Sequence, residues 1–172
     1  DFYHGRDGLE RQQLVLTEQL ALATELDLPV IFHNRKSWNE FMALLDAFKN
    51  RPPRGVCHHF TGSIELARQL LDRGLYISFC GPLTYPNASR LKAAAEYVPL
   101  DRILTETDTP DLPPAKYREE GVSYPWHVAE VVAEIARLKK VPVQEVCDAV
   151  ENNFSNLLAG EGMARDRRPR RP

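Results

Sequence analysis

The chain has 172 residues, of which 43% are hydrophobic and 27% charged, and its formal net charge is −2. This composition is typical of one globular domain and excludes a disordered or collagen-like chain. No apolar run approaches the roughly 18 residues of a membrane span, and the first residues do not form a signal peptide. We therefore expect a cytoplasmic protein without a membrane partner.

The chain contains three cysteines, Cys57, Cys80 and Cys147, which lie far apart. Their odd number and wide spacing argue against both a disulfide framework and a thiolate zinc cluster. We expect all three to act as small apolar residues.

The 22 basic residues are unevenly distributed, since the last twelve positions hold five arginines. Without those positions the body has 17 basic and 22 acidic residues, which is a net charge of −5. Such a body does not offer a broad basic face to nucleic acid, so any phosphate contact has to be local. We expect residues 1–160 to form the domain and residues 161–172 to be a disordered Arg/Pro-rich tail.

The chain alternates amphipathic stretches with short apolar runs from its start. A helix is expected over Leu9–Leu26, with Val15, Leu22 and Leu26 on one apolar stripe. Pro29 ends this helix, and the apolar run Pro29–His33 predicts a buried strand.

Serine residues mark the starts of the next two helices. The Ser37-Trp-Asn-Glu40 spacing is typical of a capping box, and apolar residues follow it at helical intervals as far as Phe48. Ser63 is expected to cap a second helix, which ends at Gly74. The strands expected on either side of that helix are Gly55–Phe60 and Leu75–Cys80.

The second half of the chain continues the alternation and adds one long loop. The expected elements are a helix over Asn87–Val98, a strand over Arg102–Thr107, a loop over Asp108–Tyr124 and helices over Pro125–Lys140 and Pro142–Gly160. Trp126 and His127 open the first of these two helices. They could border a substrate, but for Trp126 we favour packing.

Four strands with helical connections predict a parallel α/β fold, either a doubly wound sheet or a (β/α) TIM barrel. Periodicity does not choose between these two folds. His33, His58 and Asp108 each lie at or just past the C-terminal end of a predicted strand. In a barrel those strand ends converge on one point, which favours the barrel.

Two imidazoles and one carboxylate that converge in this way can ligate zinc, manganese or magnesium. Taken alone, His33 is more often a satisfied buried histidine than a ligand. Three such residues at equivalent places in successive βα units favour a metal site, because the strand ends of a barrel are where chemistry is placed.

Four strings in the sequence resemble the TatD-type metal-dependent hydrolases. They are Pro29-Val-Ile-Phe-His-Asn-Arg35, Gly55-Val-Cys-His-His-Phe-Thr-Gly-Ser63, Glu106-Thr-Asp-Thr-Pro110, and Asn153 followed by Leu157-Leu158. They occur in order at family-like intervals between residue 1 and about residue 160. The resemblance implies a TIM barrel with two divalent metal ions that hydrolyses phosphodiester bonds, commonly in DNA and often from the 3′ end.

The same resemblance suggests roles for single residues. His33 and His58 become ligands of one metal, and Asp108 becomes a ligand of the other metal and the catalytic base. Because neighbours on a strand point to opposite faces, only one residue of the His58-His59 pair should face the metal. His59 is then a packing residue or a support for the ligands. Glu106 lies two residues before Asp108 and shares its face, so it is expected to support a ligand.

Arg35 lies two residues past His33 and should therefore share its face. This position makes Arg35 a candidate contact for a substrate phosphate. An exposed surface arginine is almost as good an interpretation. The phosphate interpretation makes DNA or another phosphodiester the expected partner.

The sequence lacks two elements of the family pattern, the His-X-His pair of the first strand and the Glu of a Gly-Glu-X-Gly-Leu-Asp string. Asp1 resembles the last residue of that string. We therefore expect the chain to be the C-terminal part of a longer protein and a partial barrel of about four βα units. Such a partial barrel is expected to bind a divalent ion weakly, through His33 and His58, and to self-associate or pack loosely.

Two other functions remain open at this point. The chain could be a non-catalytic half-barrel remnant with at most weak metal binding. It could also belong to an amidohydrolase that acts on C–N bonds.

Overall fold

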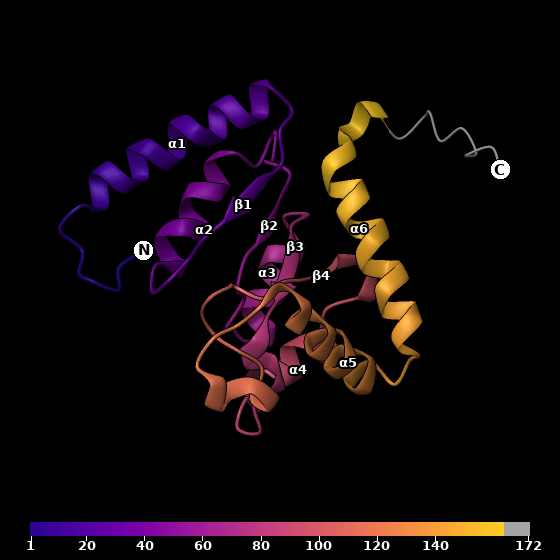
Figure 1. Cartoon of the computed structure of the whole chain (residues 1–172). Helices are drawn as coiled ribbons and strands as arrows, with labels where there is room; N and C mark the ends of the chain where they lie inside the picture. Colours follow the sequence, from indigo (N-terminus) through magenta and orange to yellow (C-terminus); the bar gives the residue numbers. More distant parts are fainter. Residues whose placement is uncertain (164–172) are drawn as a thin grey trace.

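The computed structural model describes residues 1–163 and shows an α/β fold built on one parallel sheet (Figure 1). The strands lie in chain order across the sheet, and each pairs with the next in parallel. They are β1 (Val30–Phe32), β2 (Gly55–Cys57), β3 (Tyr76–Phe79) and β4 (Ile103–Thr105). The four predicted strands are confirmed, although each is shorter than its apolar run.

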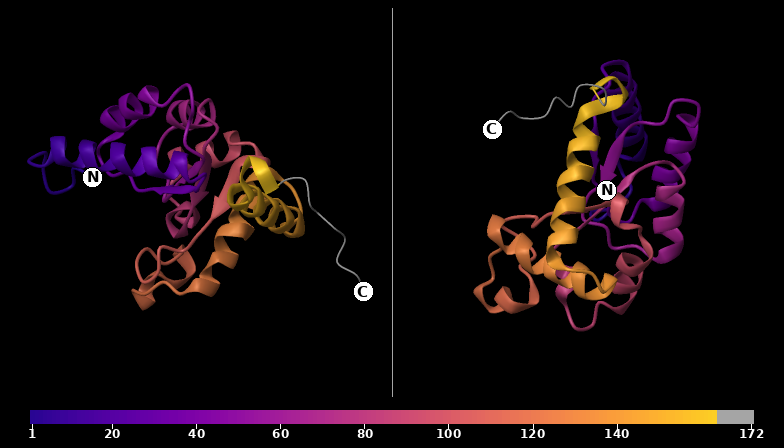
Figure 2. Two further views of the ribbon diagram at one scale, coloured as in Figure 1. Left: turned by 90° about the horizontal axis from the view of Figure 1, so that it is seen from above. Right: turned by 90° about the vertical axis from the view of Figure 1, so that its right-hand side faces the viewer.

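Helices connect the strands, as a parallel sheet requires. The α-helices of the described residues are α1 (Leu9–Glu25), α2 (Trp38–Ala47), α3 (Ile64–Leu71), α4 (Ser89–Tyr97), α5 (Val128–Lys139) and α6 (Val143–Met163). Short 3-10 helices cover Gly81–Thr84, Leu100–Arg102, Ala115–Glu120 and Pro125–His127. Figure 2 shows α1 extending away from the sheet on one side, while α6 runs along the opposite side.

Three boundaries differ from the sequence prediction. The predicted loop 108–124 contains a 3-10 helix, and the helix expected from Pro125 begins as a 3-10 turn before α5. The last helix continues to Met163, past the predicted end near Gly160. Most of the predicted tail, residues 164–172, lies outside the described residues.

The two predicted serine caps have different outcomes. Ser63 accepts a hydrogen bond from the Leu66 backbone N–H (3.3 Å), so the cap of α3 is confirmed. Ser37 precedes α2 but makes no such bond, and Glu40 pairs with Arg6. The capping box is therefore wrong as a hydrogen-bond pattern, because an arginine from the N-terminal segment takes the glutamate.

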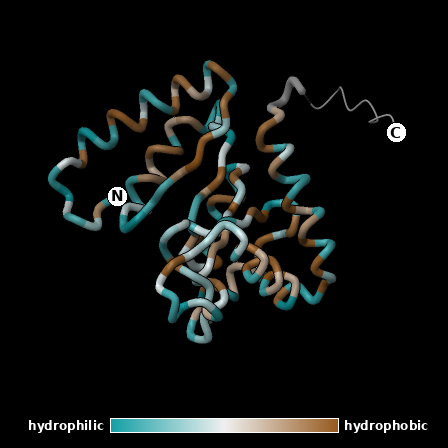
Figure 3. The backbone as a smooth tube through the Cα atoms, viewed as in Figure 1, coloured by the Kyte–Doolittle hydropathy of each residue, from teal (hydrophilic) through white to brown (hydrophobic). Residues whose placement is uncertain are grey.

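The two faces of the sheet carry different apolar clusters. Phe32, Cys57, Ile77 and Ile103 lie in register and pack under helices α2 to α5. On the opposite face Val56, Tyr76 and Leu104 pack against Leu157 of α6. Figure 3 shows the hydrophobic colour concentrated along the strands and alternating with hydrophilic colour along the helices.

Apolar side chains remain exposed at the β1 end of the sheet. Ile31 points to the same face as Val56, yet it is 74% exposed. The predicted stripe Val15, Leu22 and Leu26 is exposed as well, and Leu20 is the buried residue of α1. The described residues therefore provide no surface that covers this stripe.

Asn153, part of the fourth family-like string, holds the start of β4. Its side-chain amide donates to the carbonyl oxygens of Leu100 (2.9 Å) and Ile103 (2.8 Å), and the side chain is buried. This end of the strand lies opposite to the end that carries Asp108. We assign Asn153 a structural role on that geometry.

The three cysteines are all free and all lie within the described residues. Cys57 and Cys80 are buried, as expected of small apolar residues, and burial raises the pKa of the Cys57 thiol to about 12. Cys147 is exposed, so the apolar interpretation is wrong for it.

Among residues 1–163, no helix combines the length and the hydropathy that crossing a bilayer requires.

Candidate metal centre

The candidate ligands lie in the turns that follow β1, β2 and β4. The hydrogen-bond ladder of the sheet continues into these turns: the His58 N–H donates to the Phe32 carbonyl, and the Glu106 N–H donates to the Phe79 carbonyl, both at 3.0 Å. The backbone of each residue is thereby fixed to the neighbouring strand. A rigid backbone of this kind holds side chains at a constant separation.

Three side chains bring potential ligand atoms together, namely His58, His59 and Asp108. One atom from each lies within 4.8 Å of the others. The His58 Nε2 is 3.5 Å from Asp108 Oδ1, and the His59 Nδ1 is 3.6 Å from Asp108 Oδ2. It is the one such group of donors that occurs within residues 1–163.

His59 joins this cluster because the backbone turns at that residue. β2 ends at Cys57, and His59 has φ = +46°, in the left-handed region. Asp108 also has a positive φ, +56°. The expectation that strand alternation sends the two imidazoles to opposite faces is therefore wrong, since alternation applies only while the chain remains a strand. Left-handed backbone costs an L-residue roughly 1–2 kcal/mol, and such strain is concentrated at functional sites.

Glu106 holds the other side of His58. Its carboxylate lies 2.7 Å from His58 Nδ1 and accepts a hydrogen bond from the His59 backbone N–H at 2.5 Å. An ionised carboxylate only accepts hydrogen bonds, so the Nδ1 atom carries the proton. In the neutral form of this ring, the Nε2 atom that faces Asp108 has the free lone pair. A carboxylate in this position orients metal-binding histidines in many sites.

Burial affects the protonation of the second histidine of the cluster. The pKa of His59 is lowered, chiefly because the ring is partly withdrawn from water. A lowered pKa keeps the imidazole neutral at pH 7, which is the form that binds a metal ion.

His33 stands beside the cluster but not in it. Its ring centroid is 6.1 Å from that of His58, while its Nε2 atom is 3.0 Å from a carboxylate oxygen of Asp1. Partial burial and the neighbouring His58 both lower the pKa of His33. The structure thus brings His58 and Asp108 together as the sequence predicts, adds His59, and leaves His33 bonded to Asp1.

The cluster opens into a cleft of about 760 Å³ with a basic rim. Arg35 lies on this rim as the sequence predicts, and its guanidinium covers the Tyr3 ring at 3.4 Å. Lys36 and Arg90 also line the cleft, and sequence reasoning missed both. For Arg90 a signal existed: α4 follows β3, so its first turn begins near the edge of the sheet where the strands end.

The fold and the donor set define an α/β protein with a candidate divalent-metal centre. A family model described as "TatD related DNase" matches residues 1–159. The chain therefore belongs to this family.

Several individual proteins are similar to the chain. An uncharacterized metal-dependent hydrolase of Escherichia coli K12, YcfH, is 40% identical over 92% of this chain and 59% of its own length. A Citrobacter koseri protein named 3'-5' ssDNA/RNA exonuclease TatD is 30% identical over 92% of this chain and 62% of its own length. The chain spans about three fifths of these relatives.

A solved structure supports the fold. The crystal structure of YjjV, a TatD homolog from Escherichia coli K12, superposes with a TM-score of 0.83 at 34% identity. The match covers 92% of this chain and 60% of YjjV. The TatD-type arrangement of parallel strands and helices is thereby confirmed.

Proposed function

We propose that this chain is part of a metal-dependent phosphodiesterase that acts on DNA. The observation that carries the proposal is the His58–His59–Asp108 cluster, with Glu106 behind His58, at the base of a cleft with a basic rim. Imidazole nitrogens and a carboxylate suit Zn²⁺, Mn²⁺ and Mg²⁺. The names of the relatives add hydrolase and nuclease chemistry to that donor set.

Each residue has a distinct task in this proposal. His58 and His59 offer imidazole nitrogens, and Glu106 fixes the orientation of the His58 ring. Asp108 contributes a carboxylate as a ligand and as the group that takes a proton from the attacking water. A bound divalent ion supplies Lewis acidity toward the phosphoryl oxygen and lowers the pKa of water. Arg35, Lys36 and Arg90 offer positive charge to the phosphates that flank the reacting bond.

The ligand set expected from the sequence contains His33 where the proposed set contains His59. His33 was expected to bind together with His58, and it lies next to the cluster with its Nε2 on Asp1. We propose His59 as the third donor of the described residues and His33 as a ligand only after Asp1 has moved. A second metal ion and the cytoplasmic location stay predictions.

We also propose that the described fold is a half-barrel. The described sheet is open, and an apolar hollow of about 560 Å³ is lined by Ile31 and Leu104 of the sheet and by Phe154 of α6, among others. Parallel sheets are normally covered on both faces. The exposed Ile31 and the free edge of β1 therefore favour pairing with a second copy of the chain.

Cleavage of a labelled single-stranded oligonucleotide by the chain in Mn²⁺ tests the main proposal. We expect Asp108→Asn to lower the rate by about 10² to 10⁴-fold, since Asn keeps the shape of Asp but does not accept the proton. Asp111→Asn is the matched control, because Asp111 lines the same cleft without belonging to the cluster. Metal binding without cleavage would favour the non-catalytic half-barrel, and an equal loss in both variants would refute the role of Asp108.

A further inference from the structure

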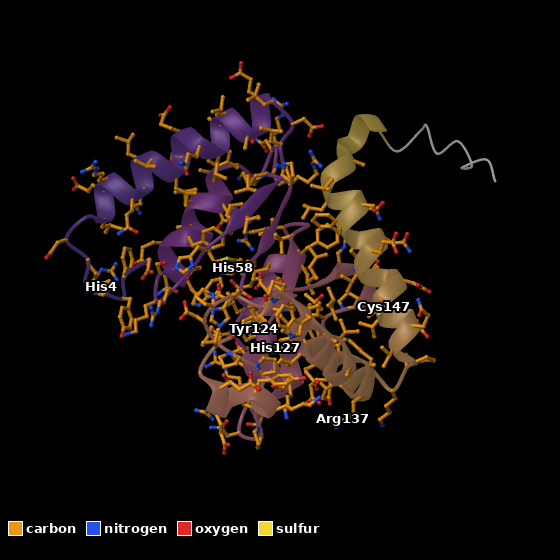
Figure 4. All side chains as sticks on the ribbon, viewed as in Figure 1. His4, His58, Tyr124, His127, Arg137 and Cys147 are labelled. Atoms are coloured by element: carbon orange, nitrogen blue, oxygen red, sulfur yellow. The ribbon has the colours of Figure 1, made fainter. Side chains whose placement is uncertain are left out.

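Four aromatic rings form one assembly in the loop and turn that follow β4. Tyr117 stacks on His127 with 3.9 Å between ring centroids, and Tyr124 stacks on Trp126 at 4.7 Å, with interplanar angles of 3° and 4°. The His127 ring is perpendicular to both Tyr124 and Trp126. His127 is almost fully buried, so the Tyr124–Trp126 pair rests on a fixed imidazole. Figure 4 shows Tyr124 and His127 close together below His58.

The pair is attached to the segment that carries Asp108. The buried Ser123 donates its backbone N–H to the Pro110 carbonyl (2.8 Å) and its hydroxyl to the Thr107 carbonyl (3.2 Å). Thr107 and Pro110 flank Asp108 in the sequence. The Tyr124 backbone N–H in turn donates to His127 Nδ1 at 3.3 Å. The backbone next to the rings is thereby bonded to the backbone next to the candidate base.

Trp126 does not pack into the core, which corrects the sequence-based interpretation. It is 66% exposed, and Tyr124 is 38% exposed. Since Tyr124 covers one face of the indole, the opposite face is the open one. Indole offers the largest aromatic surface of any side chain, and here it is held in place before any ligand arrives.

We propose that Trp126, backed by Tyr124, stacks on a base of a single-stranded nucleic acid whose backbone enters the cleft at the His58–His59–Asp108 cluster. The proposal deepens the proposed function and rests on it for the choice of a nucleic acid. A flat, exposed ring binds the face of any base, and only an unpaired strand presents such a face. The body of the chain is acidic, so the basic rim of Arg35, Lys36 and Arg90 supplies local phosphate contacts and stacking has to supplement them.

Binding of a dye-labelled oligothymidylate to the full chain in EDTA, followed by fluorescence anisotropy, tests this proposal without any cleavage. We expect Trp126→Leu, which keeps apolar volume but has no ring, to weaken binding about 5- to 100-fold. Trp126→Phe keeps an aromatic ring, so its affinity should stay within about threefold of that of the unsubstituted chain. Tyr97→Ala is the control, since Tyr97 is an exposed aromatic residue at the far end of α4.

An abasic strand of the same length separates stacking from charge. We expect the natural chain to bind it more weakly than oligothymidylate and the Trp126→Leu change to leave that binding unaltered. Equal binding of oligothymidylate by the natural chain and Trp126→Leu would overturn the inference, as would an equal loss for the abasic strand. Addition of Mn²⁺ then tests the proposed function separately. Binding that depends on the Trp126 ring, without cleavage of the strand, would support the stacking site and refute the nuclease proposal.

Discussion

The two ends of the sheet differ in how well they are covered. At the β3 and β4 end, Ile77 and Ile103 are fully buried, and α5 and α6 pack over β4. At the β1 end, Ile31 is exposed, and so are Leu14 and Leu22 of α1. The candidate ligands also differ between the two ends. His58 and His59 both contact Asp108. His33, which follows β1, contacts Asp1 instead. The ligand candidates that contact one another thus follow β2 and β4, and the candidate that follows β1 has a different partner.

Alanine substitutions at the two ends of the sheet should show the largest difference in the free energy of unfolding. Ile77→Ala removes a fully buried side chain from the main core, so we expect a loss of about 2–5 kcal/mol in the free energy of unfolding. At a chain concentration too low for self-association, Ile31→Ala removes a side chain that is already in water, and its cost should stay within about 0.5 kcal/mol. Urea unfolding of the two variants measures both values. A loss above about 2 kcal/mol for Ile31→Ala under these conditions would mean that Ile31 is buried within the monomer.

Self-association should depend on the exposed face. We expect the chain to sediment faster than a monomer at low micromolar concentration, since burying an isoleucine contributes about 1.5–3 kcal/mol. Ile31→Lys should weaken association at least about tenfold. Ile64→Lys provides the control, because Ile64 is exposed on α3, away from the open edge. A compact monomer in the natural chain would refute the pairing of half-barrels.

The serines that precede α2 and α3 should show a smaller difference in the free energy of unfolding. Ser63→Ala breaks the bond to the Leu66 N–H and should cost about 1 kcal/mol. Ser37 makes no cap bond, so Ser37→Ala should cost less than half as much. Thermal unfolding followed by circular dichroism compares them. Equal costs would show that Ser37 caps α2 in solution.

Much of the fold could be predicted from local patterns. Apolar runs located all four strands, and Ser63 located the start of α3, because each signal depends on a few adjacent residues. Glu40 was misjudged because its partner Arg6 is distant in the sequence. The exposure of Val15 could not be predicted either, since periodicity shows that a face is apolar but not what covers it.

The candidate site was predicted in part for a similar reason. His58 and Asp108 could be located because they follow strand ends, and Glu106 because it lies two residues before Asp108. His59 was misplaced because the sequence contains no sign of its left-handed backbone, which depends on the bond from its N–H to Glu106. The exposure of Trp126 was missed because an aromatic residue at the start of a helix is more often packed.

Calorimetric titration with Zn²⁺ tests most directly whether His58, His59 and Asp108 form one metal site. We predict that His59→Ala lowers the affinity by at least about 10-fold, because even the loss of a group that only supports a ligand costs about 10- to 100-fold. It predicts that His33→Ala, whose side chain faces Asp1, changes the affinity less than about threefold. A large loss in His33→Ala together with unchanged binding in His59→Ala would contradict the account and restore the ligand set expected from the sequence.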